Sequence, residues 1–246
     1  MKLIRKAILI GCSNVPPELP GVEEDIQRYF NFLISNNGGA WETGEITISL
    51  NNNETELYRK FKPMEDADFA FVLIAGHGEH RIYNHDPNHY KTGTYYCSSD
   101  ENVILVKNLF PRVLRSVVLV DVCREYKYYK EMKKSISTKL FSMTESAPLL
   151  ERKDYRAMYD NHILNCPEAR VVLYSCSPNQ EAADNGDGGA FSKSLLRSVK
   201  YDGRGSVITI KNAFDYAKQY VYENHYPQLP IMEAGRGRSF FPFALT

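Results

Sequence analysis

Two apolar runs constrain the fold of this chain more than any other feature of its sequence, because each run ends at a chemically reactive side chain. Residues 71–76 lead directly into His77, and residues 117–122 lead into Cys123. Continuous apolar runs of this length are typical of strands that are buried on both faces of a parallel sheet. The carboxyl ends of such strands face the crevice where open α/β sheets bind ligands, so we expect both reactive side chains there.

A histidine beside a cysteine is the minimum equipment of a cysteine peptidase, because a base must take the thiol proton when the sulfur attacks. We therefore expect His77 to be the general base and Cys123 the nucleophile. The backbone N–H groups of Gly78 and Cys123 are the expected donors to the oxyanion. Gly76 and Gly78 lack Cβ atoms, which lets the chain turn sharply and lets a substrate backbone come close.

Strand-like and helix-like segments alternate along the chain and predict an α/β fold with a mainly parallel six-stranded sheet and helices on both faces. Besides the two apolar runs, strands are expected at residues 6–11, 45–50, 170–175 and 239–244. Helices are expected at residues 22–34, 55–62, 102–115, 191–199 and 211–223. Residues 81–99 are predicted to form a long loop or hairpin, and residues 125–168 are the least regular stretch. Pro242 is tolerable in an edge strand, so the last strand is expected at an edge of the sheet.

The composition argues against several classes of protein. Lysine and arginine number 30, as do aspartate and glutamate. This balance favours neither a nucleic-acid partner nor an anionic membrane. No apolar stretch approaches the roughly 20 residues that span a bilayer, and the amino terminus has no signal-peptide pattern. The five cysteines are widely spaced and form no CxxC pair, which favours reduced thiols and a cytoplasmic protein.

Five motifs, taken in order along nearly the whole chain, resemble the caspase-like cysteine peptidases, the superfamily of caspases, metacaspases and paracaspases. The motifs are residues 7–11 with Leu19-Pro20-Gly21 and Asp25, then Gly76-His77-Gly78, then Asp121-Val122-Cys123-Arg124, then residues 175–184 with 189–192, and finally residues 226–230. The resemblance implies a caspase-like fold and one peptidase domain over residues 1–246. Its parts are expected to be a large-subunit-like region 1–124, an activation loop at about 125–169 and a small-subunit-like region 170–246.

The sequence departs from true caspases beside the cysteine. Caspases have Gln two residues before the cysteine and Gly two residues after it, whereas this chain has Asp121 and Glu125. Metacaspases and paracaspases have Asp at the first position and cleave after Arg or Lys, and metacaspases also resemble this chain at Asp184. The resemblance therefore implies that Asp121 and Asp184 bind a basic substrate residue. Two carboxylates can engage a guanidinium in bidentate fashion, which favours Arg over Lys.

The segment 125–168 lies where caspases carry the linker that is cut on activation. It contains Lys133-Lys134 and Arg152-Lys153, which would suit an acidic specificity pocket, so self-cleavage there, or reordering on partner binding, is a hypothesis. Short bacterial caspase-like chains resemble defence components. This implies an upstream activator protein and a protein substrate such as a gasdermin-like effector. No cofactor is expected. Monomer and homodimer both stay open, because caspases dimerise through their last strand and metacaspases generally do not.

Structural roles compete with the functional ones for several of these residues. A cysteine after an apolar run is usually a packing residue, which is the role expected for Cys12 and Cys176. Asp121 can hydrogen-bond backbone amides, and Asp184 lies in an Asn/Gly/Asp-rich loop where turn acids are common. Three further histidines follow His77, but Pro87 breaks any helix that would align them, so no metal site is expected. They are His80, His85 and His89.

Two other function classes are consistent with an α/β fold. A catalytically silent caspase-like adaptor would act by protein–protein binding, and the intact His77 and Cys123 argue against it. A nucleotide-binding protein is disfavoured, because residues 11–14, which follow the first strand, form neither a GxGxxG nor a Walker loop.

Overall fold

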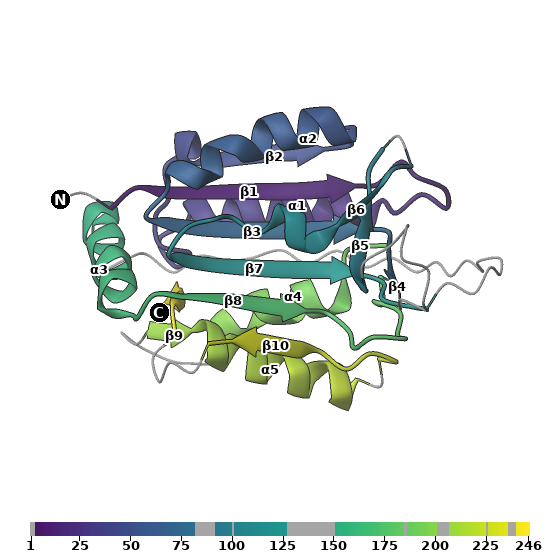
Figure 1. Ribbon diagram of the computed structural model, residues 1–246. Coiled ribbons are helices and arrows are strands. Elements are labelled where there is room, and N and C mark those ends of the chain that lie inside the picture. Colours follow the sequence, from purple (N-terminus) through teal and green to yellow (C-terminus); the bar gives the residue numbers. More distant parts are fainter. Residues whose placement is uncertain are drawn as a thin grey trace.

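A twisted six-stranded sheet forms the centre of the protein in the computed structural model (Figure 1). The structure describes residues 3–81, 92–99, 101–126, 151–184, 186–200, 207–224, 226–235 and 240–246. The strand order is β10-β8-β7-β3-β1-β2, and every neighbouring pair is parallel except β8 and β10. The strands are β1 (Arg5–Cys12), β2 (Ile46–Leu50), β3 (Phe69–Gly76), β7 (Arg115–Val122), β8 (Ala169–Tyr174) and β10 (Ile231–Ala234). The predicted mainly parallel six-stranded sheet is confirmed.

The apolar runs are continuous because the central strands are covered on both faces. Every residue of β3 is buried. Alternate side chains point to opposite faces, so that Leu73 and Leu119 belong to one apolar cluster while Val72 and Val118 belong to the other. Such two-sided burial is the reason why the pattern along these strands does not alternate between apolar and polar residues.

Helices cover both faces, as predicted (Figure 1). On one face lie α1 (Gly21–Ile34), α4 (Ala190–Arg197) and α5 (Ile210–Glu223). On the other lie α2 (Glu54–Phe61) and the short 3-10 helices η2 (Lys62–Asp66) and η3 (Val106–Leu109). Two further 3-10 turns are η1 (Thr43–Glu45) and η4 (Ser198–Lys200). The helix α3 (Arg152–Asn165) lies at the end of the sheet where the parallel strands begin (Figure 1).

A small antiparallel sheet stands at the opposite end, where β3 and β7 finish (Figure 1). It consists of β4 (Gly78–Arg81), β5 (Gly93–Cys97) and β6 (Val103–Leu105). The strands β4 and β5 form a hairpin that begins at Gly78, three residues before the segment 81–99 where a loop or hairpin was predicted, and residues 82–91 between the strands lie outside the described residues.

The predicted helix at residues 102–115 is wrong. Residues 103–105 form β6, which pairs with β5, and η3 follows as a single 3-10 helix. The apolar residues Ile104, Val106 and Leu109 are all buried, and their spacing suits an amphipathic helix as well as this strand and turn. Pro111 then prevents a helix from continuing into β7.

The expectation of an irregular stretch is wrong for residues 152–165, which form α3. The apolar periodicity of this segment is weak because Tyr159 and Ile163 are the only buried residues of the helix. Its start is instead defined by a capping box, in which the side chains of Glu151 and Asp154 each accept a backbone N–H of the first turn. Residues 127–150 lie outside the described residues.

The predicted position of the last strand, at an edge of the main sheet, is also wrong. Residues 242–245 form β11 (Pro242–Leu245), which pairs with β9 (Val207–Thr209) in a separate two-stranded sheet. The edge of the main sheet is formed by β10, with antiparallel pairs from Ile231–Tyr174 to Ala234–Val171. Strand β10 has only four residues, which is too few for an alternating apolar pattern to be recognised in the sequence.

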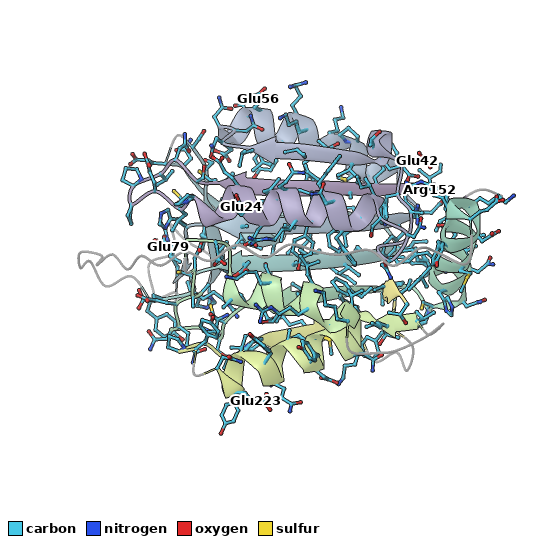
Figure 2. The ribbon with its side chains drawn as sticks, turned by 180° about the vertical axis from the view of Figure 1, so that it is seen from behind. Glu24, Glu42, Glu56, Glu79, Arg152 and Glu223 are labelled. Carbon is cyan, nitrogen blue, oxygen red and sulfur yellow. The ribbon has the colours of Figure 1, made fainter. Side chains whose placement is uncertain are left out.

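A buried arginine connects α3 to β1. The side chain of Arg5 is fully buried, with its guanidinium carbon 4.5 Å from the Trp41 ring centroid and 5.6 Å from that of Tyr159. Its nitrogen atoms lie 3.1 Å from the Asp160 carboxylate and 3.5 Å from that of Glu45. Arg152 and Glu42 lie at the same end of the molecule (Figure 2). The helix that follows residues 127–150 is thereby joined to the first strand.

We predict that Arg5→Leu lowers the free energy of unfolding by about 3–5 kcal/mol, because it leaves the carboxylates of Asp160 and Glu45 without this buried cation. Urea unfolding followed by circular dichroism measures the loss. Arg59→Ala is the matched control, since Arg59 forms an exposed pair with Glu56 and is expected to change stability by less than about 0.5 kcal/mol. Equal losses in the two variants would contradict the prediction.

Candidate active site

The ends of β3 and β7 bring His77 and Cys123 together. The register of the two strands pairs Gly76 with Val122, which are their last residues. The next residue on each strand is one of the predicted pair, and neighbouring strands lie about 4.8 Å apart. Gly78 confirms the close approach, because a Cβ atom there would lie 2.6 Å from Val122 Cγ2. The imidazole and the thiol are therefore carried at the same level on adjacent strands.

The His77 ring is oriented by main-chain carbonyls of the loop after β1. Its Nε2 lies 2.6 Å from the carbonyl oxygen of Pro17 and 3.1 Å from that of Val15. A carbonyl only accepts, so Nε2 carries the proton and Nδ1 has the lone pair. This arrangement fixes the tautomer that a general base needs and would stabilise the imidazolium once it forms. Sequence reasoning missed both carbonyls, because a main-chain acceptor has no side-chain signature.

The half-buried thiol of Cys123 lies beside a segment that follows β8. Residues 179–182, which we call the covering segment, run beside it, with the Arg124 N–H donating to Gln180 O at 2.9 Å. The Ala182 N–H donates to Cys123 Sγ at 3.4 Å. Burial raises the pKa of Cys123 to about 11, and the nearby carboxylate of Glu181 adds to this while the Ala182 N–H opposes it. The covered sulfur is therefore a neutral thiol at pH 7 and needs a base to react.

The main chain around the cysteine is held by Arg124. Its buried guanidinium lies 4.1 Å from the Tyr174 ring centroid and donates to Cys176 O at 2.9 Å. It also donates to Thr94 Oγ1 at 2.9 Å, which links the cysteine loop to the small sheet. These contacts position the backbone on which Cys123 is carried.

One of the two predicted oxyanion donors, the Gly78 N–H, faces the cysteine loop. The His80 N–H donates to Glu125 O at 2.9 Å, so this side of β4 faces the chain just after the cysteine. Amide groups two residues apart in a strand point to the same side, which directs the Gly78 N–H towards Cys123. This direction suits the predicted role of the Gly78 N–H, and the role of the Cys123 N–H stays a prediction.

Three carboxylates converge beside this pair, around the glycines before α4. Asp121 is buried and accepts hydrogen bonds from Ser192 Oγ at 2.5 Å and from the Ser192 N–H at 3.3 Å. Asp184 forms an isolated β-bridge with Gly189. Asp25 of α1, a third acid, accepts from the Gly189 N–H at 2.7 Å. A Cβ atom on Gly189 would collide with the Asp121 carboxylate, which shows how closely the acids approach this backbone.

Burial raises the pKa of two of these acids. For Asp121 the desolvation is opposed by Ser192 and Ser175 and increased by the charge of Asp184. The pKa of Asp25 is raised well above its usual value by burial and then by the charge of Asp121, although Arg28 lies 3.6 Å away. Like charges that share a site disfavour one another's ionisation until a cation arrives. The cluster is thus suited to a cationic ligand.

The structure brings Asp121 and Asp184 together, as predicted, and adds Asp25. The only signal for Asp25 was its place in the first family-like motif. Both acids also have the structural roles that the sequence suggested. Asp121 accepts from the backbone N–H of Ser192, and Asp184 accepts from the Gly186 N–H at 2.7 Å. Both carboxylates therefore shape the loop as well as the cluster.

The other candidates from the sequence lie elsewhere. Cys12 and Cys176 are fully buried, as expected of core thiols. His80 contacts Thr94 Oγ1 at 3.2 Å, while His85 and His89 lie outside the described residues. Within the described ranges, no three His, Cys, Asp or Glu side chains are arranged to hold a metal ion. Nor is any helix in these ranges long and apolar enough to cross a membrane.

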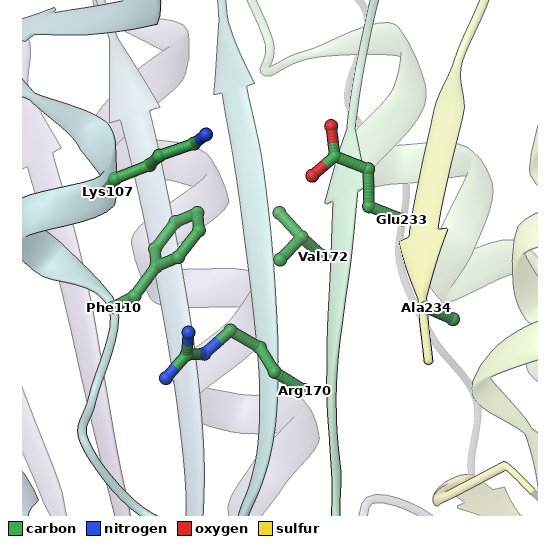
Figure 3. Close-up of a pocket in the computed structure, with 6 residues that line it drawn as sticks. All are labelled: Lys107, Phe110, Arg170, Val172, Glu233 and Ala234. Atoms are coloured by element: carbon green, nitrogen blue, oxygen red, sulfur yellow. The ribbon is translucent and has the colours of Figure 1, made fainter. Parts of the chain in front are cut away.

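A pocket of about 400 Å³ lies on the open face of β8 and β10, away from this site (Figure 3). Arg170 in its wall is near the start of β8, whereas Ser175 and the acid cluster lie beyond the end of that strand. The lining residues are Lys107, Phe110, Arg170, Val172, Glu233 and Ala234. This pocket is not part of the candidate active site.

The fold and the site define an α/β protein with an imidazole and a thiol at the ends of adjacent parallel strands. The family model of the caspase domain matches residues 4–241, so the chain belongs to the caspase family. Protein GSU0716 from Geobacter sulfurreducens has a similar structure, with a TM-score of 0.60 and 14% identity over 94% of this chain and 93% of that one. Caspase-1 from Spodoptera frugiperda is also similar, with a TM-score of 0.57 and 13% identity over 94% and 86%. No curated protein matches the chain.

We predict that alkylation of Cys123 by iodoacetamide in the unliganded protein keeps accelerating from pH 7 to pH 10. The thiolate is the reactive form, and a pKa of about 11 leaves its fraction rising throughout this range. Mass spectrometry of the labelled peptide measures the rate, with the urea-unfolded protein as a control whose thiols titrate near their ordinary pKa of about 8.5. A plateau below pH 8 would show a preformed thiolate and contradict the prediction.

Proposed function

We propose that this caspase-family protein is a cysteine endopeptidase that uses Cys123 and His77 to cleave protein substrates after a basic residue, with Arg preferred over Lys. The observation that carries the proposal is the convergence of two sets of groups at one edge of the sheet. One set is the thiol and imidazole at the ends of β3 and β7. The other is the carboxylate cluster around Gly189.

The proposed reaction proceeds by acyl transfer. His77 takes the thiol proton at Nδ1 as Cys123 Sγ attacks the scissile carbonyl, and it then donates this proton to the leaving amine. The N–H groups of Gly78 and Cys123 stabilise the oxyanion, and one such donor can be worth about 3 kcal/mol of barrier. Water then hydrolyses the thioester with His77 as the base, which regenerates the thiol.

The proposed specificity follows from charge. A guanidinium entering beside Asp121 and Asp184 can form a bidentate hydrogen-bonded pair, and its charge would oppose the rise that burial causes in the pKa of Asp121. Asp25 adds a third carboxylate on the far side of Gly189, and its charge is partly balanced by Arg28. A substrate aspartate would meet like charges and is rejected.

Regulation by a partner or by self-cleavage is part of the proposal. Arg152-Lys153 lies at the start of α3, and Arg152 donates to Trp41 O at 2.6 Å, so this bond is not presented as an extended substrate. We therefore assign self-cleavage to Lys133-Lys134, which lies outside the described residues. The proposed partners are a protein substrate such as a gasdermin-like effector and an upstream activator. None of the five cysteines forms a disulfide, which supports a reducing, cytoplasmic setting.

A silent adaptor is the second candidate, because the covering segment contacts the thiol and burial raises its pKa. In that case the protein would act by binding, and no substrate would be turned over. Turnover of a peptide by the native protein, lost in Cys123→Ala, separates the two functions.

We predict that arginyl and lysyl fluorogenic peptides are cleaved and that aspartyl peptides are not. Asp121→Asn and Asp184→Asn should each lower kcat/KM for the arginyl peptide by about 30-fold or more, as expected when one partner of a buried charge pair is lost. Asp215→Asn is the control, since Asp215 pairs with Lys211 on the surface of α5. Equal or better cleavage after aspartate would remove the assignment of the pocket.

We also predict that purified native protein is clipped within residues 127–150 while Cys123→Ala stays intact. The expected cut follows Lys133 or Lys134, because only a basic residue suits the proposed pocket. Mass spectrometry of the fragments identifies the site. Identical fragmentation of both proteins would exclude self-cleavage.

A further inference from the structure

A buried amide side chain connects the two walls of the carboxylate cluster. Gln228 is 6% exposed and lies in the segment that leads into β10. Its Nε2 donates to Ser175 O at 3.0 Å, and its Oε1 accepts from the Ala183 N–H at 2.6 Å. Both ends of the amide are therefore used, and both bond to main chain.

The two residues that Gln228 joins belong to different parts of the site. Ser175 follows β8, and its N–H donates to Val120 O at 2.9 Å, which places it beside the residue before Asp121. Ala183 lies in the loop after the covering segment, immediately before Asp184. One uncharged side chain thus links the backbone beside Asp121 to the backbone beside Asp184. It does so without adding charge to a cluster in which the acids already disfavour one another's ionisation.

A second set of hydrogen bonds, made by Gln180 and Ser177, serves as a comparison. Gln180 Oε1 accepts from the Ser177 N–H at 3.1 Å and from the Leu229 N–H at 2.8 Å. Ser177 Oγ also donates to Leu229 O at 2.9 Å. These bonds join the same two segments outside the cluster. The segment at Gln228 is therefore anchored independently of the Gln228 side chain.

We propose that Gln228 is a positioning residue that sets the separation of Asp121 and Asp184 and thereby the affinity for a basic substrate residue. The inference rests on the proposed function. Loss of either hydrogen bond would let the loop at Ala183 move away from the end of β8, which would weaken bidentate binding of a guanidinium. The cysteine and histidine are attached to β7 and β3, and any change that reaches Cys123 through the Ala182 N–H cancels in a ratio of two labelling rates at the same sulfur.

The test compares chloromethylketones that carry arginine or alanine at the reacting residue. We expect Gln228→Leu, which keeps the side chain's bulk, to reduce the arginine-over-alanine ratio of Cys123 labelling rates by about tenfold. KM for an arginyl peptide should rise by a similar factor with kcat nearly constant. The matched control Ser177→Ala, which removes the hydrogen bond to Leu229 O between the same two segments, should leave the ratio within about twofold.

A second variant keeps the proposal falsifiable where Gln228→Leu does not fold. Gln228→Glu can still accept from the Ala183 N–H, but it donates to Ser175 O only when its carboxyl is protonated. The ratio of its KM to the native KM should therefore rise with pH, whereas a packing role would leave that ratio flat. Asp121 and Asp184 lie near this position in both proteins, so any pH dependence that they cause cancels in the ratio of the two KM values.

Three outcomes are decisive. A native protein that reacts equally with both ketones overturns the basic pocket itself. A native preference that survives unchanged in Gln228→Leu, or a flat KM ratio in Gln228→Glu, overturns the role of Gln228. Equal loss of preference in Ser177→Ala and Gln228→Leu would show general loosening of the loop and would also overturn it.

Discussion

The site depends on the parallel register of β3 and β7. Pairing runs from Ala70–Ser116 to Gly76–Val122, so both strands end at the same level and the next residue on each is reactive. A slip of one residue would turn the side chains of one strand to the other face, and two-sided burial makes such a slip costly. The small sheet and Arg124 then hold the chain just past each strand end.

Exclusion of water links the two halves of the site. Burial raises the pKa values of Cys123, Asp121 and Asp25, so the site disfavours negative charge at several positions at once. A cation is the natural complement of such a site, because it stabilises the ionised acids that surround it. The proposed preference for a basic residue and the need for an imidazole base thus have the same physical origin.

The sequence was sufficient where one local pattern determined the structure. The apolar runs predicted β3 and β7, and their ends predicted that His77 and Cys123 would follow adjacent parallel strands. Prediction failed where competing patterns were equally short or weak. Residues 103–109 fit a helix as well as β6 and η3, and β10 has only four residues.

The missed parts of the site depend on contacts between distant segments. Asp25 reads as one polar residue on an amphipathic helix, and its role becomes visible only because Gly189, 164 residues later, donates to it. The carbonyl of Pro17 and the amide bonds of Gln228 likewise involve main-chain groups that no residue pattern records. The roles of such main-chain groups can be recognised only once the three-dimensional structure is known.

A crystal structure of the protein after reaction with a peptidyl-arginyl chloromethylketone tests the central claim most directly. The account predicts a covalent bond to Cys123 Sγ, with the carbonyl-derived oxygen at the N–H groups of Gly78 and Cys123. It also places the guanidinium between Asp121 and Asp184. An adduct on another residue, or a guanidinium that points into solvent away from both carboxylates, would contradict it.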